Sequence, residues 1–377
     1  MIFSASGNLL GECIHTQKSS RFGGVIPSFA MGYHAEALPK ALDNVIEQAT
    51  GVKSNGVENL KGRGIEIVAV TNRPGLSGSL SVGLSFAKYL CIKNQLPMIP
   101  IHHMEAHALT SRMEHEVSFP YLVLLISGGH CLLALAESVN EFKLLGQSVD
   151  NSPGEIIDKI ARKLKLHMLS PDLRDVSGGK AMEITGTGGD PNLYSFNIPM
   201  RNRRNCDYSF GGYCTHVMET INRIEKEVHI EPDVFLPDLS SFCASVEYGI
   251  GKHLCERLQR GIEYIDSKDA WPNVKSDKSK RTLVVSGGVA SNVRIKNMLK
   301  QVCEAFNCRM LAPDPKYCTD NGVMVAWNGL EKHRVLSELI PCDKVMDVSI
   351  SPRECFGTDI SLAVEEAYIK CKWVKVI

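Results

Sequence analysis

The run Tyr121-Leu-Val-Leu-Leu-Ile126, followed by Ser127-Gly128-Gly129, joins an apolar stretch to an abrupt glycine turn. Six apolar residues in succession are typical of a strand that is buried on both faces of a sheet. A second run, Thr282-Leu-Val-Val285, ends in the same tripeptide, Ser286-Gly287-Gly288. Glycines at a strand end allow a sharp turn whose backbone N–H groups can face an anion. The repetition predicts two related halves that face one ligand.

Helical patterns separate these strands and predict an α/β architecture. Apolar residues recur at helical spacing over residues 154–168, and polar residues at 150–152 are placed to cap the start. The same period runs over 240–261, with Ser240 or Ser241 as the expected cap. A third helix is expected over 77–94.

Composition limits the class of protein. The 377 residues exceed what one compact core usually needs, so we expect two domains. The formal net charge of zero excludes a globally basic nucleic-acid binder but allows a local basic patch. The 13 scattered cysteines form no CxxC pair, which favours free thiols over disulfides. No apolar run has the length that crosses a bilayer, so no membrane association is expected.

A cluster of histidines carries the first candidate chemistry. His103 and His107 stand four residues apart, which on a helix places them on one face at roughly 5–6 Å between Cβ atoms. Two imidazoles at that separation can share a metal ion. Asp320 is the best third ligand, although its place before an apolar helix favours an N-cap over a metal ligand, and His130 is a rival ligand. These ligand types suit iron as well as zinc.

A zinc peptidase is the competing interpretation of this cluster. In the HExxH pattern the glutamate follows the first histidine directly and acts as general base. Glu105 lies two residues after His103 and therefore points about 200° around the helix from it. That geometry disfavours the peptidase.

Nucleotide and nucleic-acid signals are weaker. The sequence contains neither a P-loop nor a dinucleotide fingerprint. Asp158 suits a ribose hydroxyl, although a salt bridge or simple exposure is the default interpretation. Basic residues gather at 201–213 and 275–281, and the second run is interpreted as a solvated loop. In the first run, three arginines precede Tyr208 and Phe210, a mixture that contacts phosphates and stacks on bases, although without further context a surface turn is the favoured interpretation.

Taken together, the motifs resemble the tRNA N6-adenosine threonylcarbamoyltransferase family, and in particular its mitochondrial branch in animals. The resemblance covers about residues 7 to 335. In chain order the motifs are Phe22-Gly23-Gly24-Val25-Ile26-Pro27, Pro74-Gly75-Leu76, His103-Met104-Glu105-Ala106-His107, Leu125-Ile126-Ser127-Gly128-Gly129-His130, Gly154-Glu155 with Asp158-Lys159, Asp207-Tyr208-Ser209-Phe210, Ser286-Gly287-Gly288-Val289-Ala290-Ser291-Asn292 and Cys318-Thr319-Asp320-Asn321-Gly322.

The resemblance implies a fold and a reaction. The fold is actin/Hsp70-like, with two α/β lobes and the ligand in the cleft between them. We expect an N-terminal lobe over 1–101 and 328–377, and a C-terminal lobe over 102–327 that carries the metal and adenylate motifs. The reaction transfers threonylcarbamoyl from threonylcarbamoyl-AMP, made by a separate synthase, to N6 of adenosine 37 in tRNAs that read codons beginning with A.

The resemblance also implies site residues and partners. His103, His107 and Asp320 would bind one iron or zinc ion per subunit, and no further catalytic residue is assigned. Arg201, Arg203 and Arg204 are candidates for contacting tRNA. A homodimer and a mitochondrial location are expected. The substrate-binding set comprises Leu125, Ile126, Ser127, Gly128, Gly129, Asp158, Gly179, Glu183, Ser291 and Asn292.

The chain departs from the family at its start. Members normally begin with a strand that reads like Leu-Gly-Ile-Glu-Thr-Ser-Cys-Asp-Asp-Thr, and this chain begins after it. We therefore expect an N-terminally truncated form that is less stable and less active than one with the strand restored, because a sheet loses an edge partner. A scaffolding relative that keeps the fold without catalysis remains an alternative.

Overall fold

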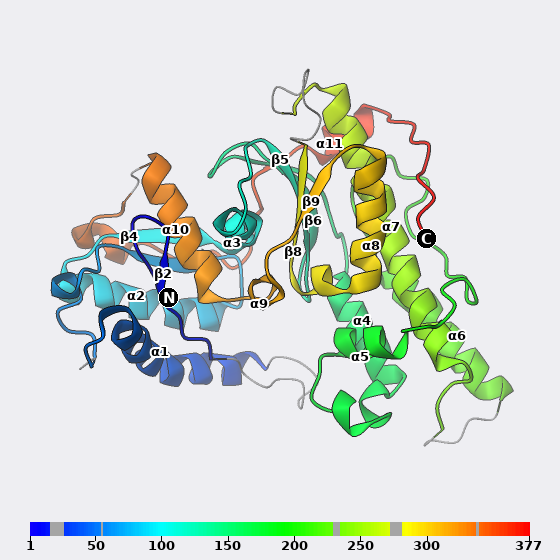
Figure 1. The fold of residues 1–377 in the computed structure, drawn as a ribbon, viewed down its shortest axis with the longest axis horizontal. Helices are drawn as coiled ribbons and strands as arrows, with labels where there is room; N and C mark the ends of the chain where they lie inside the picture. Colours follow the sequence, from blue (N-terminus) through cyan, green and yellow to red (C-terminus); the bar gives the residue numbers. More distant parts are fainter. Residues whose placement is uncertain (16–25, 54–55, 229–233, 272–280, 337–338) are drawn as a thin grey trace. The chain divides into compact units, whose positions relative to one another are not determined.

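A computed structural model describes residues 1–15, 26–53, 56–228, 234–271, 281–336 and 339–377 of the chain (Figure 1). The chain divides into two compact units. Unit 1 comprises Met1–Glu116 and Asp320–Phe356, and unit 2 comprises Val117–Thr319 and Gly357–Ile377. The predicted α/β class with two parts is confirmed.

The boundaries of the units differ from those of the predicted lobes. The helix that carries His103 and His107 belongs to unit 1, although we expected it in the same lobe as the glycine turns. Contacts of this helix with the helix over 322–336 place it there. The last 21 residues belong to unit 2 because Thr358–Asp359 extends the sheet of that unit.

Unit 2 is built on a six-stranded sheet of order β10-β7-β6-β5-β8-β9. Strands β5, β6 and β7 pair in antiparallel fashion, whereas β8, β9 and β10 pair in parallel with their neighbours. The two strands predicted from sequence, β5 and β8, are adjacent in this sheet. The strands are β5 (Tyr121–Ile126), β6 (Cys131–Ala136), β7 (Phe142–Gln147), β8 (Thr282–Ser286), β9 (Arg309–Leu311) and β10 (Thr358–Asp359).

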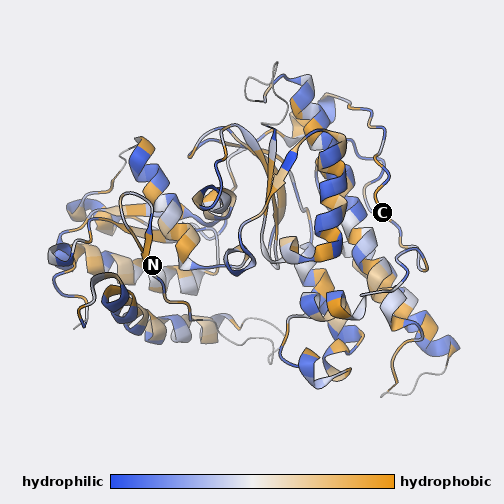
Figure 2. Ribbon diagram, viewed as in Figure 1, coloured by the Kyte–Doolittle hydropathy of each residue, from blue (hydrophilic) through white to orange (hydrophobic). Residues whose placement is uncertain are grey.

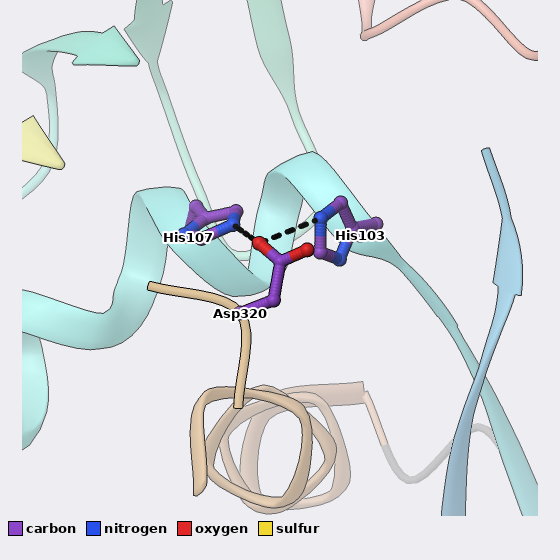
Figure 3. A group of neighbouring side chains, drawn as sticks. All are labelled: His103, His107 and Asp320. Atoms are coloured by element: carbon purple, nitrogen blue, oxygen red, sulfur yellow. Dashed lines mark hydrogen bonds and ion pairs between the residues drawn. The ribbon is translucent and has the colours of Figure 1, made fainter. Parts of the chain in front are cut away.

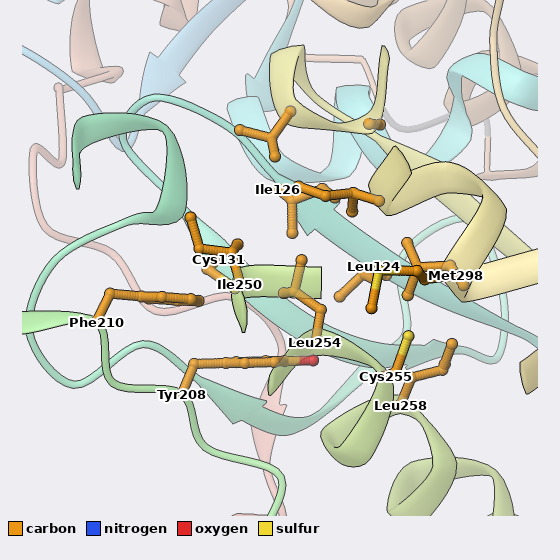
Figure 4. Close-up of a cluster of buried hydrophobic side chains, with 14 of the residues drawn as sticks. Leu124, Ile126, Cys131, Tyr208, Phe210, Ile250, Leu254, Cys255, Leu258 and Met298 are labelled. Carbon is orange, nitrogen blue, oxygen red and sulfur yellow. The ribbon is translucent and has the colours of Figure 1, made fainter. Parts of the chain in front are cut away.

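Helices pack against one face of this sheet and enclose a large core. Helices α7 and α8 cover one face of the sheet (Figure 1), and an added methyl at Gly261 of α7 would meet Leu133 of β6 at 2.5 Å. Tyr208 and Phe210 lie inside the core (Figure 4). The helices are α4 (Pro153–Lys163), α5 (Gly178–Thr185), α6 (Gly211–Glu227), α7 (Leu239–Ser267), α8 (Val293–Ala305), α9 (Pro315–Cys318) and α11 (Ser361–Glu366).

Unit 1 has two short two-stranded sheets and smaller apolar clusters. Strands β3 (Val68–Arg73) and β4 (Met98–His102) are parallel, and the α2 helix connects them as a βαβ unit. The remaining elements are β1 (Ile2–Phe3), β2 (Leu9–Gly11), α1 (Pro27–Thr50), α2 (Ser77–Asn94), α3 (His103–Leu109) and α10 (Gly322–Leu336). Strands are mostly apolar in both units (Figure 2).

Short 3-10 helices complete the two units. They are η2 (Lys61–Arg63), η3 (Thr110–Met113), η4 (Leu166–Met168), η5 (Pro171–Leu173), η7 (Gly288–Ser291) and η8 (Cys342–Asp347).

The predicted helices are present with revised ends. The helix over 77–94 is confirmed as α2, and the one expected over 154–168 ends at Lys163 before η4. Ser152 is the cap of α4, whereas Asp238, not Ser240 or Ser241, caps α7 by accepting from the Ser241 N–H. Asp238 adopts a left-handed backbone, and α7 begins at Leu239, one residue before the start that the apolar period predicts.

Two sequence features fall outside the described residues, namely positions 22–25 of the Phe22 motif and positions 275–280 of the second basic run. Within the described residues, no helix is long and apolar enough to cross a membrane.

Candidate functional site

The two histidines lie on the short helix α3, which follows β4 directly. His102 caps this helix, because its Nδ1 accepts a hydrogen bond from the Met104 N–H at 3.2 Å. That cap fixes the first turn, and the imidazole rings of His103 and His107 then meet edge to face with centroids 4.8 Å apart. The predicted helical pairing of the two histidines is confirmed.

Asp320 reaches the same point from the start of α10 (Figure 3). Its Oδ1 lies 3.0 Å from Nε2 of His107 and 3.4 Å from Nε2 of His103. The competing role as a helix cap falls to the next residue, since the Asn321 side chain accepts from the Met324 N–H at 2.9 Å. The Asp320 carboxylate therefore points to the histidines. His130, the rival ligand, belongs to unit 2 and is not in this group.

The geometry of the three residues fits a metal ion. One ligand atom from each lies within 4.8 Å of the others. Tetrahedral ligands about 2.05 Å from zinc stand about 3.3 Å apart, close to the two distances that Asp320 makes. His107 is almost fully buried and His103 is largely buried, whereas the Asp320 side chain is 75% exposed.

Electrostatics favour the protonation states that a metal requires. Burial lowers the pKa of His107, although the hydrogen bond with Asp320 opposes this, so the neutral imidazole is favoured. For Asp320, desolvation raises the pKa, but hydrogen bonds from His103 and His107 outweigh it and lower the pKa below its usual range. Neutral imidazoles and an ionised carboxylate are the forms that coordinate metals.

Ion pairs between α3, η3 and α10 support the metal ligands. Glu105 lies 2.6 Å from Nζ of Lys332, and both side chains are largely buried. Nearby, Nε of Arg112 donates to both oxygens of Glu331 at 2.9 and 3.0 Å. These pairs connect the segment that carries the histidines to the helix that follows Asp320. Sequence reasoning missed both pairs, because the partners lie more than 200 residues apart.

The glycine turns lie side by side at the ends of β5 and β8 in unit 2, where Leu125 pairs with Ser286. Gly287 has a φ of +103°, and an added methyl there would lie 2.3 Å from the carbonyl oxygen of Ile126. The prediction of two related halves was therefore wrong, because both turns belong to one sheet of one unit. An added methyl at Gly128 or Gly129 would meet no atom within 4 Å, so this turn borders open space.

The backbone of the first turn, not its strand side chains, can contact a ligand. Leu125 and Ile126 are buried in the core, so only their main-chain atoms are available. Ser127 Oγ accepts from the N–H groups of Gly129 at 3.3 Å and His130 at 3.0 Å, which fixes the shape of the turn. Ser152 at the start of α4 donates to the Gly128 carbonyl at 2.7 Å.

Asp158 and Gly179 are in direct contact. Oδ1 of Asp158 accepts from the Gly179 N–H at 3.2 Å, which joins α4 to the first turn of α5. Burial raises the pKa of Asp158, although this hydrogen bond opposes the shift. One turn further along α5, Glu183 Oε1 accepts from the Val293 N–H at 3.1 Å and Oε2 pairs with Lys180 at 2.9 Å. Both oxygens of Glu183 thus bind the protein itself.

Asn292 is held by residues that the sequence analysis did not identify. Its Oδ1 accepts from the Ile295 N–H, and its Nδ2 donates to Oε1 of the buried Glu247 at 2.6 Å. Glu247 also pairs with Nε of Arg294 at 3.3 Å. Burial raises the pKa of Glu247, with the Asn292 hydrogen bond and the Arg294 charge opposing it. An acidic residue within the apolar stripe of α7 was the available signal, because buried charges need partners.

Ser291, the neighbour of Asn292, has an exposed side chain whose hydroxyl donates to the Gly288 carbonyl at 2.7 Å. Contacts therefore connect the predicted substrate residues of β5, α4, α5 and α8 within unit 2.

The basic loop, defined as residues 199–206, is anchored by the buried side chain of Arg257. This buried guanidinium donates to the carbonyls of Met200, Arg203 and Asn205. Arg201 and Arg203 are exposed, and Arg204 is partly exposed. The alternative that bases stack on Tyr208 and Phe210 was wrong, because both rings are buried in the core where no base can reach them.

Comparison with known proteins gives consistent matches. The family model described as tRNA N6-adenosine threonylcarbamoyltransferase matches residues 8–327. The mitochondrial enzyme of that name from Rattus norvegicus is 41% identical over 377 residues, which is 100% of this chain and 87% of the relative. The human mitochondrial enzyme is 39% identical with the same coverages. The enzyme from Rickettsia massiliae is 34% identical over 88% of each chain.

Solved structures are similar at low sequence identity. HypF from T. kodakarensis has a TM-score of 0.48 and 11% identity, covering 79% of this chain and 43% of HypF. Component A of (R)-2-hydroxyglutaryl-CoA dehydratase from Acidaminococcus fermentans has a TM-score of 0.41 and 12% identity, covering 91% of this chain and 93% of that one.

Proposed function

Since the chain belongs to the tRNA N6-adenosine threonylcarbamoyltransferase family, we propose that it transfers threonylcarbamoyl from threonylcarbamoyl-AMP to N6 of adenosine 37 in mitochondrial tRNAs that read codons beginning with A. The amine attacks the carbamoyl carbon, the bond from that carbon to the phosphate oxygen breaks, and AMP leaves as the amine loses a proton. The family match over residues 8–327 carries this proposal. The names of the vertebrate relatives support the mitochondrial location.

His103, His107 and Asp320 would hold one iron or zinc ion per subunit. When bound, such an ion supplies a Lewis acid that polarises carbonyl or phosphoryl oxygens. The convergence of the three ligand atoms within 4.8 Å supports this assignment. His102 orients the helix through its cap, and the pair of Glu105 with Lys332 keeps α3 against α10.

Unit 2 would bind the adenylate. The Ser127-Gly128-Gly129 turn would face the phosphate and acyl oxygens, because it borders open space at the end of β5. Asp158, Gly179, Glu183, Ser291 and Asn292 would contact the ribose and adenine. Asn292 retains one amide hydrogen beyond the one that it donates to Glu247, and that hydrogen is the donor we assign to the nucleotide.

A peptidase is disfavoured by the state of Glu105. A general base must reach a metal-bound water, whereas Glu105 forms a largely buried ion pair with Lys332 on the side of α3 away from the histidine pair.

The direct test incubates the purified chain with synthetic threonylcarbamoyl-AMP and an unmodified tRNA transcript, and detects the modified nucleoside by mass spectrometry. Product formation that requires metal supports the proposal. Absence of product with metal present would favour a scaffold, and glycoprotein cleavage lost in His103→Ala would favour the peptidase. Light scattering of the same sample tests the expected homodimer.

A further inference from the structure

The final segment of the chain, residues 367–377, matches none of the motifs described above. We call it the C-terminal strap. It contains three lysines and two aromatic residues, Tyr368 and Trp373, and no acidic residue. In Figure 1 the strap follows α11 and belongs, like the basic loop, to unit 2.

The strap is held in place through its backbone. The Gln259 amide of α7 donates to the Lys372 carbonyl and accepts from the Val374 N–H, both at 2.9 Å. Gln301 of α8 holds the N–H and carbonyl of Ile377 in the same two-sided way, again at 2.9 Å. Arg260 donates to the Ile369 carbonyl at 3.0 Å. These contacts fix the path of the strap without using its own charged side chains.

Side chains of the strap divide between an inner and an outer side. Val376 is buried, and Ile369 and Val374 pack against the main core of unit 2. Lys370, Lys372 and Lys375 are exposed, as are Tyr368 at 60% and Trp373 at 45%. The outer side therefore presents cations and aromatic rings. Rings that stay exposed to water do not stabilise the fold, which points to a role in binding.

The strap is continuous with the basic loop. The guanidinium of Arg204 lies 3.5 Å from the centroid of the Tyr368 ring, and Arg203 lies 3.9 Å from Glu365 just before the strap. At the other end, the Arg260 guanidinium lies 5.3 Å from the Trp373 ring centroid. The loop and the strap thus share one stretch of surface, on which Glu365 is the acidic residue that contacts Arg203.

We propose that the strap and the basic loop form one RNA-binding surface that takes the phosphodiester backbone of tRNA, with Tyr368 and Trp373 stacking on unpaired bases. This inference rests on the proposed function for the choice of tRNA as ligand. Lysines contact phosphates as point charges, and exposed aromatic rings provide sequence-tolerant stacking. Lysines and aromatic rings alternate along a segment whose backbone is anchored, and this arrangement suits single-stranded nucleic acid. An acidic protein partner would bind the lysines but would not require the exposed rings.

The test measures binding of a fluorescent, unmodified tRNA transcript to the full chain by anisotropy across a range of salt concentrations. In Lys370→Gln/Lys372→Gln/Lys375→Gln, we expect roughly tenfold weaker binding near physiological salt. The slope of log affinity against log salt should fall by about two, because each lost phosphate contact releases about 0.7–0.9 fewer counterions. Trp373→Ala should weaken binding without changing that slope.

Two matched variants control for charge and folding. Lys40→Gln/Lys53→Gln/Lys61→Gln removes three exposed lysines of unit 1 and should bind as the unaltered chain does. Lys370→Arg/Lys372→Arg/Lys375→Arg keeps the charges and should restore binding. Equal losses in both glutamine variants, or an unchanged salt slope in the strap variant, would overturn the inference. If the unaltered chain binds tRNA but forms no modified nucleoside, the proposed function fails while the surface stands.

Discussion

Two adjacent residues at the start of α10, Asp320 and Asn321, have different roles. Asp320 contacts the histidines and Asn321 caps the helix, although either side chain is chemically able to cap. The sequence favoured the cap for Asp320, and this was wrong, because the choice depends on the residue at which the helix begins. If α10 began one residue earlier, the Asp320 carboxylate would lie at the cap position and would point to the helix N-terminus. This single detail of backbone geometry is what completes the candidate metal site.

Asp320→Asn should lose the metal while the fold is retained. The amide has nearly the same shape but is a much weaker ligand than a carboxylate, so we expect metal content to fall from one ion per chain to near zero. Elemental analysis of the purified variant measures this, with circular dichroism as the check on folding. The matched change Asn321→Ala should keep the metal and lose about 1 kcal/mol of stability. A full complement of metal in Asp320→Asn would refute the assignment.

Glu247→Ala should impair binding of the adenylate. Without its carboxylate, Asn292 and Arg294 lose their common partner, so the amide hydrogen that we assign to the nucleotide is no longer oriented. We expect the KM for threonylcarbamoyl-AMP to rise about tenfold, equivalent to about 1.4 kcal/mol, with the KM for tRNA unchanged. Glu247→Gln should recover part of the loss because its amide oxygen still accepts from Asn292.

The control for this experiment lies at the other end of the same helix. Asp266 pairs with Arg281 at 2.9 Å and stands 19 residues from Glu247, about 28 Å along α7. Asp266→Asn should reduce stability without changing either KM. Unchanged KM values with a lower apparent kcat in Glu247→Ala would show a general loss of folded protein instead of a local effect.

Helix α7 shows what a sequence pattern reveals about an element and what it omits. Its apolar stripe and approximate length were predicted, because burial against the sheet imposes the helical period. The pattern offered a signal for Glu247 within the apolar stripe but gave no indication that His253 and Arg257 lie inside the protein, since their partners come from distant segments. The two-residue strand β10 was likewise missed, because only pairing with β7 makes it a strand.

His253 should make the protein sensitive to acid. Burial lowers its pKa to about 3, with Arg257 adding to the shift, whereas an unfolded histidine titrates near 6.5. Between these values the unfolded chain binds a proton that the folded chain does not, so stability falls as the pH falls. This one group should cost about 2 kcal/mol between pH 7 and pH 5.

Chemical denaturation at the two pH values measures this effect. In His253→Gln, the loss of stability on acidification should be smaller by about that amount, because glutamine does not titrate. His15→Gln, at an exposed position, should lose as much stability as the unaltered chain. An equal loss in His253→Gln would assign acid sensitivity to other groups.

At the scale of the whole molecule, the candidate ligands divide between the two units. The three metal-ligand candidates belong to unit 1, and the glycine turns with the residues assigned to the nucleotide belong to unit 2. Each unit has apolar clusters of its own. The sequence predicted two parts but assigned the histidines to the wrong one, because helix α3 follows β4 directly and only its contacts with α10 reveal where it belongs.

Metal and nucleotide should therefore protect different amides from hydrogen exchange. A ligand that binds only the folded form raises the free energy of unfolding. The increase grows with the ratio of ligand concentration to Kd and is about 2.7 kcal/mol when that ratio is one hundred. Removing metal with a chelator should increase exchange in α3 and α10, and adding AMP should slow exchange in α4 and α5. Protection of α4 and α5 by metal alone would contradict this division.

The order of the segments along the chain also constrains when the enzyme becomes competent during synthesis. Asp320 is separated from His107 by 213 positions. Unit 1 resumes only after Val117–Thr319, the first segment of unit 2, has been made. A ribosome that has not yet released residue 320 holds a chain with two histidines and no third ligand. If these three residues hold a metal, its loading would wait until residue 320 has emerged, and shorter nascent chains would lack the third ligand.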